Sequence, residues 1–270
     1  MTHPTADSTL ASAEETILLE RPAPHVALVR LNRPARRNAI NGAMARAIEA
    51  HVQAIEADTD IRVALIAAAP GPTFCAGADL AEAAAGRGHE LMTAAGGFAG
   101  FVEAPRRKPW IAAISGSALG GGLEIALSCD MIVCAESSVL GLPEVKRGLI
   151  AGAGGLFRLP RALPRALALE MIATGEPIAA ARALALGLVN AVVPAEAVEQ
   201  AALDLAARIV VNAPLSVRES LAIARHAARS SDAAMLAESQ AAADRLMPTH
   251  DWAEGPRAFV EKRAPQWRGC

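Results

Sequence analysis

The strongest constraint on the fold is a repeated pattern in which a short apolar run leads into a glycine-rich turn. Residues 63–69 lead into the loop 74–79, and residues 110–114 lead into the turn 115–122 and then a helical stretch. Apolar runs of this length, bounded by turn residues, are typical of buried strands. Because such strands alternate with helical stretches, the sequence predicts parallel pairing and an α/β domain.

The two ends of the chain show different patterns. Residues 17–31 form two apolar runs joined by a proline-rich turn, which predicts a hairpin, and Asn41 is well placed to cap a helix that ends near Asp58. Beyond about residue 156 helical patterns dominate. We therefore predict a loose tail at 1–15, an α/β core at 16–200 and a helical C-terminal region at 201–270.

Composition excludes several classes of function. The formal net charge is −2 and the basic residues are scattered, which argues against a nucleic-acid partner or a charged membrane patch. The apolar runs are far shorter than the roughly 20 residues that a membrane span requires, and the N-terminus does not resemble a secretory signal. The 4 cysteines lack CxxC spacing, which favours reduced thiols over a zinc site. We expect a cytoplasmic protein.

The glycine-rich turns suggest a chemistry. Each turn precedes a helix start, where backbone N–H groups have no partner within the helix, and glycine lets a ligand approach them closely. N–H groups aimed at one oxygen from two turns would form an oxyanion hole. Glu124 is a candidate acid or base, although alone it could simply favour the helix dipole. No Gly-Lys-Ser/Thr follows the glycine triplet, and Ser117 lacks the G-x-S-x-G spacing of a nucleophile.

Specific motifs make the chain resemble a known superfamily. The motifs are Phe74-Cys-Ala-Gly-Ala-Asp-Leu80, Ser115-Gly-Ser-Ala-Leu-Gly-Gly-Gly-Leu-Glu124, Ser128-Cys-Asp130, Gly141-Leu-Pro-Glu144, the run 148–155 and Phe259-Val-Glu-Lys-Arg263. In this order they resemble the enoyl-CoA hydratase/isomerase (crotonase) superfamily over nearly everything after residue 16. The resemblance implies a crotonase-like spiral of ββα units with a helical C-terminal region that builds a homo-oligomer, either a trimer or a dimer of trimers.

The resemblance also implies roles for individual residues. Glu124 and Glu144 match the catalytic acid/base pair, and the N–H groups of Ala76 and Gly121 match the oxyanion hole for a thioester carbonyl. The implied contacts to the CoA thioester are Ala76, Gly77, Ala78, Asp79, Leu80, Gly121, Arg37, Phe259 and Lys262. Phe259 and Lys262 would approach from a neighbouring subunit.

The implied activity is reversible addition of water to the 2,3-double bond of a 2-enoyl-CoA, in fatty-acid or related acyl-CoA metabolism. The acyl-CoA is the substrate, and no metal or separate cofactor is implied. Other reactions of the superfamily remain open, among them carnitinyl-CoA dehydratase, which the run 158–164 resembles, and enoyl-CoA isomerase. A non-catalytic acyl-CoA binding or assembly protein is the alternative of a different class.

Overall fold

A computed structural model describes residues 15–270. The predicted tail at 1–15 therefore lies almost entirely outside the described residues. None of the helices within 15–270 combines the length and apolar character that a membrane crossing requires.

The core contains two sheets. The first has 6 strands in the order β1-β2-β3-β7-β9-β12, and all pairs except β1–β2 are parallel. Its strands are β1 (Ile17–Ala23), β2 (Val26–Leu31), β3 (Val63–Ala68), β7 (Trp110–Ile114), β9 (Met131–Ala135) and β12 (Ala191–Val193). The second has 4 strands in the order β11-β10-β8-β4. They are β4 (Thr73–Cys75), β8 (Ser117–Leu119), β10 (Val139–Gly141) and β11 (Ile178–Ala179).

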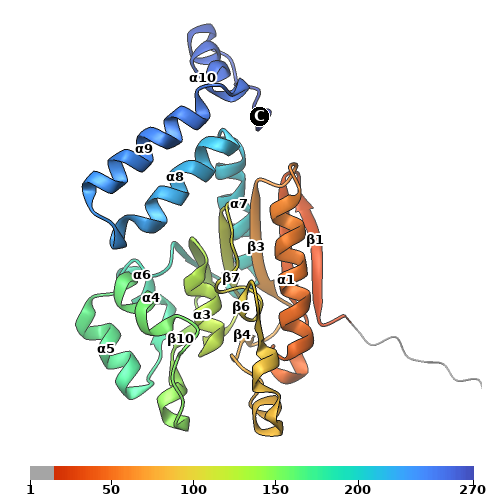
Figure 1. The fold of residues 1–270 in the computed structure, drawn as a ribbon. Helices are drawn as coiled ribbons and strands as arrows, with labels where there is room; N and C mark the ends of the chain where they lie inside the picture. The colour runs from red at the N-terminus through yellow and green to blue at the C-terminus, as the bar shows by residue number, and fades with distance from the viewer. Residues whose placement is uncertain (1–14) are drawn as a thin grey trace, which may run out of the picture.

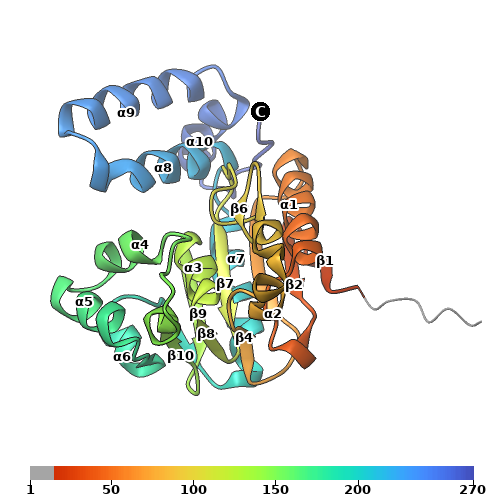
Figure 2. The ribbon, with the colours of Figure 1, turned by 60° about the horizontal axis from the view of Figure 1, so that its bottom comes forward.

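The chain passes between the two sheets in a repeated unit. A strand of the first sheet is followed by a short strand of the second, as β3 is by β4, β7 by β8 and β9 by β10. A helix or helical turn then follows: α2 (Leu80–Glu82), α3 (Gly121–Ser128) and the 3₁₀ helix Pro143–Arg147. Each unit moves one strand along the first sheet, so the short strands β4, β8 and β10 are neighbours in the second sheet (Figures 1 and 2). The predicted α/β class is confirmed.

Two helices cover opposite faces of the 6-stranded sheet. On one face, α1 (Gly42–Ala57) buries Met44, Ile48 and Val52 against Val29 and the rest of the main core. On the other face, α7 (Val198–Val210) packs on the alternate side chains of the same strands. The predicted cap of α1 is confirmed, because the Asn41 side chain accepts a hydrogen bond from the Met44 N–H at 2.9 Å.

The remaining helices follow along the C-terminal half. They are α4 (Gly155–Ala162), α5 (Arg165–Thr174), α6 (Ala180–Ala185), α8 (Pro214–His226), α9 (Asp232–Leu246) and α10 (His250–Glu261). Helices α8, α9 and α10 lie together at one end of the molecule in both views (Figures 1 and 2). The predicted boundary at 200/201 falls inside α7, which packs on the sheet, so the separate helical region starts only after α7.

Candidate active site

The first glycine-rich turn follows β4 and exposes one backbone N–H group. The Ala76 N–H donates to the carbonyl of Arg37 at 3.0 Å, so the prediction that Ala76 supplies a free N–H is wrong. The neighbouring groups pair with Ile40: its N–H donates to the Gly77 carbonyl, and its carbonyl accepts from the Asp79 N–H. Because Gly77 and Asp79 both face Ile40 in this parallel bridge, the N–H of Ala78 between them points away from Ile40. No residue within 15–270 accepts a hydrogen bond from it. Ala78 is therefore the free donor of this turn.

The second turn joins β8 to α3 and lies directly against the first. Gly121 starts α3, and its N–H has no acceptor within the described residues. A Cβ on Gly77 would lie 2.8 Å from the Gly121 nitrogen, and a Cβ on Gly122 would lie 2.1 Å from the Cys75 carbonyl oxygen. Side chains are excluded at both positions because real Cβ atoms do not approach so closely. The expected meeting of the two turns is confirmed.

Glu124 lies on the first turn of α3 and is 3% exposed. Its Oε1 accepts a hydrogen bond from the Gly155 N–H, at the start of α4, at 2.9 Å. Burial raises the pKa of Glu124 to about 7, opposed by that N–H donor and reinforced by the charge of Glu144. A carboxyl group with this pKa can hold or release a proton near neutral pH.

Glu144 brings a second carboxyl group to the same turn. It lies on the 3₁₀ helix that follows β10, and its Oε2 is buried with no hydrogen-bond partner among the described residues. A Cβ on Gly120 would lie 2.9 Å from Glu144 Oε1, which places the carboxyl group against the residue preceding Gly121. Burial raises its pKa above the ordinary value. The structure thus brings Glu124, Glu144 and Gly121 together.

Arg158 supports the loop that holds Glu124, a role that no motif in the sequence indicated. On α4, it donates to the Ala153 carbonyl at 2.9 Å and to the Val102 carbonyl at 2.7 Å. Its positive charge also lowers the pKa of Glu124, against the larger effect of burial. The only signal in the sequence was its position just after the glycine-rich run 148–155.

Asp79 and Leu80, both expected to contact substrate, lie at the end of the first turn. The Asp79 carboxylate forms an ion pair with Arg33 at 2.7 Å and accepts from the Ala81 N–H at 3.1 Å. The Arg33 guanidinium holds the pKa of Asp79 below its ordinary value. Leu80 follows at the start of α2 and is 44% exposed. The Asp79 side chain therefore fixes the loop, and Arg33 is a structural residue that no sequence pattern indicated.

The other expected contacts divide into two groups. The Arg37 side chain is exposed beside the first turn. The backbone carbonyl of Arg37 accepts a hydrogen bond from the Ala76 N–H and so holds that turn. Phe259, which is 85% exposed on α10, and Lys262, just after α10, belong to the C-terminal end of the molecule, apart from β4 and α3 in both views (Figures 1 and 2). A single chain does not bring them to the glycine-rich turns.

The thiol of Cys75, at the start of the first glycine-rich turn, is poorly suited to act as a nucleophile. Burial raises the pKa of the Cys75 thiol to about 12, and its Sγ faces the Asn38 carbonyl at 3.1 Å. Within residues 15–270, no three His, Cys, Asp or Glu side chains cluster as metal ligands. The groups available for chemistry are therefore two carboxyl groups and two backbone N–H groups.

Comparison with known proteins agrees with this arrangement. Residues 22–270 match the family model described as enoyl-CoA hydratase/isomerase. The mevalonyl-coenzyme A hydratase sidH of Aspergillus fumigatus is 39% identical over 98% of this chain and 97% of its own length. The carnitinyl-CoA dehydratase of Proteus mirabilis is 39% identical over 78% of this chain and 83% of its own length.

A solved structure agrees with the same assignment. The crystal structure of an enoyl-CoA hydratase from Mycobacterium tuberculosis superimposes with a TM-score of 0.90 at 39% identity, covering 94% of this chain and 99% of that one. The family match over residues 22–270 includes both glycine-rich turns and both glutamates. With two glycine-rich turns in contact and a carboxyl pair beside them, the chain belongs to the enoyl-CoA hydratase/isomerase family.

Proposed function

We propose that this enzyme is an enoyl-CoA hydratase, which adds water reversibly across the 2,3-double bond of a 2-enoyl-CoA. The observation that carries the proposal is the pair Glu124 and Glu144, one buried and one half-buried carboxyl group, both with raised pKa values, at one glycine-rich turn. Hydration requires a base that takes a proton from water and an acid that gives a proton to C2. A double-bond shift needs only a single carboxyl group that moves one proton.

The thioester carbonyl would lie at the two free N–H groups. In this proposal the Ala78 and Gly121 N–H groups bind the carbonyl oxygen, which gains negative charge as water attacks C3. Each such donor typically contributes about 2.7–4 kcal/mol of transition-state stabilisation. Substrate binding would also involve the backbone of Gly77 and the Arg37 side chain, with Ala76 acting only as a wall of the turn.

The surroundings of the two glutamates suggest their roles. Glu124 accepts an N–H bond, which stabilises the ionised form, so we assign it as the base that activates water. Glu144 has a buried oxygen without a donor, a setting that favours the protonated form, so we assign it as the acid that protonates C2. Water addition changes no oxidation state overall, so the proposed reaction requires no redox cofactor.

The test is the loss of enoyl absorbance when crotonyl-CoA is added to wild type, Glu124→Gln and Glu144→Gln. Each variant keeps the shape of the side chain but cannot exchange a proton. We expect a fall in kcat of about 10²–10⁴-fold for either variant. The matched control is Glu136→Gln, an exposed residue after β9, which should retain wild-type activity.

Other outcomes would identify the alternatives. A wild type that shifts the double bond of a 3-enoyl-CoA but leaves crotonyl-CoA unchanged would be an isomerase. Dehydration of carnitinyl-CoA at a much higher kcat/KM than crotonyl-CoA hydration would identify the carnitinyl-CoA dehydratase alternative. Tight binding of crotonyl-CoA with no turnover would favour the non-catalytic protein.

We further propose that the enzyme acts as a trimer or a dimer of trimers in the cytoplasm. Phe259 and Val260 on α10 are 85% and 78% exposed, more than a large apolar pair in a monomer would favour. In such an assembly Phe259 and Lys262 would reach the CoA of a neighbouring subunit. The cysteines at 75, 129, 134 and 270 are all unpaired, which fits a reducing compartment.

A further inference from the structure

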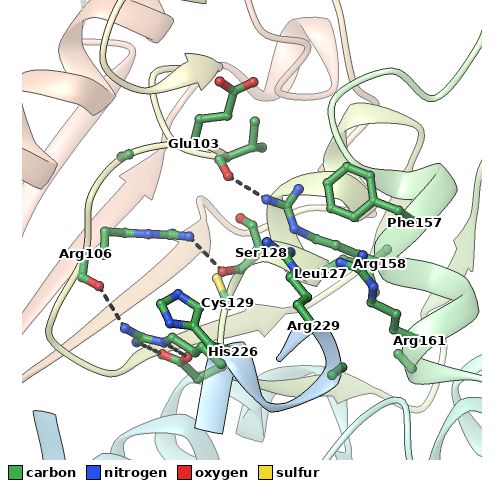
Figure 3. Close-up of a pocket in the computed structure, with 16 residues that line it drawn as sticks. Glu103, Arg106, Leu127, Ser128, Cys129, Phe157, Arg158, Arg161, His226 and Arg229 are labelled. Atoms are coloured by element: carbon green, nitrogen blue, oxygen red, sulfur yellow. Dashed lines mark hydrogen bonds and ion pairs between the residues drawn. The ribbon is translucent and has the colours of Figure 1, made fainter. Parts of the chain in front are cut away.

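An arginine-rich cavity lies at the far end of α3 from the glycine-rich turns. It has a volume of about 670 Å³ and lies between the C-terminal end of α3, helix α4 and the segment that follows α8 (Figure 3). Neither Glu124, Glu144 nor either glycine-rich turn lines it. It is therefore separate from the candidate active site.

The cavity carries an excess of positive charge. Its lining includes 5 arginines, namely Arg106, Arg158, Arg161, Arg225 and Arg229, but only 2 carboxyl groups, Glu103 and Asp130. Among the described residues only one of these arginines is in an ion pair, Arg225 with Asp130 at 2.7 Å. The other four guanidinium groups form no ion pair within residues 15–270, and their gathering in one cavity is disfavoured by like-charge repulsion.

Three of the arginines gather around one aromatic ring. The guanidinium carbons of Arg158, Arg161 and Arg229 lie 5.0, 5.0 and 5.9 Å from the centre of the Phe157 ring (Figure 3). The ring attracts each cation through its face, but it carries no net charge to offset three of them. A ligand with several negative oxygens would complete this group.

A buried donor at the cavity wall adds an independent observation. Arg106 stacks on Phe101, with its guanidinium carbon 3.9 Å from the ring centre, and its Nη2 donates to the Ser128 carbonyl at 2.7 Å. Its Nη1 is buried and has no acceptor within residues 15–270. Burial also lowers the pKa of Arg106, which means that its charge is poorly compensated. A buried N–H donor without an acceptor is unfavourable, so the positive charge of this wall is not offset by the protein.

We propose that this cavity is a binding site for a small multivalent oxyanion, carrying carboxylate or phosphate groups. Arg161 and Arg229 would bind its oxygens in the fork geometry that guanidinium groups offer to such anions, with Arg158 and Arg106 adding positive charge at the cavity wall. Phe157, Leu127 and Val102 line the same space, so a ligand with a short carbon skeleton fits better than a bare halide. The site goes beyond the proposed hydratase activity and does not depend on it.

The test is calorimetric titration of the full-length protein with citrate and with inorganic phosphate at constant ionic strength set by chloride. The informative variant is Arg161→Gln/Arg229→Gln, because both side chains are exposed and their loss leaves the fold intact. We expect at least one anion to bind wild type and the affinity to fall by about tenfold or more in the variant. The control, Arg165→Gln/Arg182→Gln, removes two exposed arginines from α5 and α6 and should change affinity by less than about twofold.

Repeating the titration with saturating coenzyme A distinguishes two sources of the anion. Unchanged citrate affinity means that the cavity takes a free anion, whereas loss of citrate binding means that it takes phosphate groups of coenzyme A. The proposal is overturned if neither anion binds the wild type. It is also overturned if both double variants bind as tightly as the wild type.

Discussion

The carboxyl group of Glu124 is buried, so its ionisation costs free energy in the folded protein. Its pKa is raised from 4.5 to about 7, so the folded protein holds a proton that the unfolded chain loses above about pH 4.5. The native state binds more protons between these two values. The contribution of Glu124 to stability is therefore full below about pH 4.5 and is lost as the pH rises through 7.

This linkage predicts a pH-dependent effect of Glu124→Gln. Glutamine does not ionise, so the variant escapes the cost that wild type incurs at high pH. We expect the variant to gain about 2–3 kcal/mol of stability relative to wild type between pH 5 and pH 8. Thermal unfolding of both proteins at the two pH values measures the difference. An equal difference at both pH values would contradict a raised pKa.

Gly77 and Gly86 allow a matched test of the contact between the two turns. Both have positive φ, 91° and 79°, so alanine is strained by about 1–2 kcal/mol at either site. Only Gly77 would place its methyl group against the Gly121 nitrogen, whereas a Cβ on Gly86 meets nothing within 4 Å. We expect Gly77→Ala to reduce crotonyl-CoA turnover by about 10²-fold or more and Gly86→Ala to leave it nearly unchanged. Equal activity of the two variants would argue against a hole at this contact.

At the residue scale, the sequence identified the groups that lie inside a motif. Glu124, Glu144 and Gly121 lie together in the structure, as the family resemblance implied. The choice of Ala76 over Ala78 failed because the direction of each N–H depends on pairing with Arg37 and Ile40. Those partners are nearly 40 residues away in the chain, so no local pattern reports them.

Among the elements, the long buried strands were predictable and the short ones were not. The predicted strands at 63–69 and 110–114 are β3 and β7. The edge strand β12 has 3 partly buried residues, and its pairing with β9 comes from the tertiary fold. The sequence of helix α7 predicts one apolar face. It does not show that this face covers the 6-stranded sheet.

Arg225 forms several hydrogen bonds that hold helix α8 against the core. Arg225 donates to both oxygens of Asp130 and to the carbonyls of Arg106 and Lys108, at 2.7–3.0 Å. We expect Arg225→Met to destabilise the protein by about 2 kcal/mol or more, because Asp130 would lose its counter-charge. Denaturant unfolding measures this. The comparison is Arg245→Met, whose side chain is 54% exposed beside Glu219 and should cost less than about 1 kcal/mol.

At the scale of the whole molecule, the outer surface of α10 is the best place to test assembly. The proposed trimer should be visible by light scattering of wild type. We expect Phe259→Asp/Val260→Asp to shift the protein towards monomers, because two charges would replace an apolar contact. Leu19→Asp, an exposed leucine on β1, is the control and should leave the assembly unchanged. A monomeric wild type would contradict the proposal.

The sequence predicted the α/β core and the helical end, but it could not predict how far α8, α9 and α10 stand from the glycine-rich turns. That distance depends on contacts such as Arg225 with Asp130, which link residues 95 positions apart. For the same reason the arginine-rich cavity could not be predicted from the sequence, because its walls come from four separate segments, 102–106, 127–130, 157–162 and 225–229.

The tight contact between the two turns has a consequence for selectivity. With Gly77 against Gly121 and Gly122 against Cys75, this part of the chain has no room to adjust to its ligand. Every thioester substrate must therefore bind to the same rigid pair of turns. The preference of the enzyme for one acyl chain over another has to arise elsewhere in the protein. The neighbouring segment 83–98 is the natural candidate, because Phe98 already rests on Gly121 and its other residues are largely exposed. Exchanging that segment between relatives should transfer chain-length preference while leaving the chemistry intact.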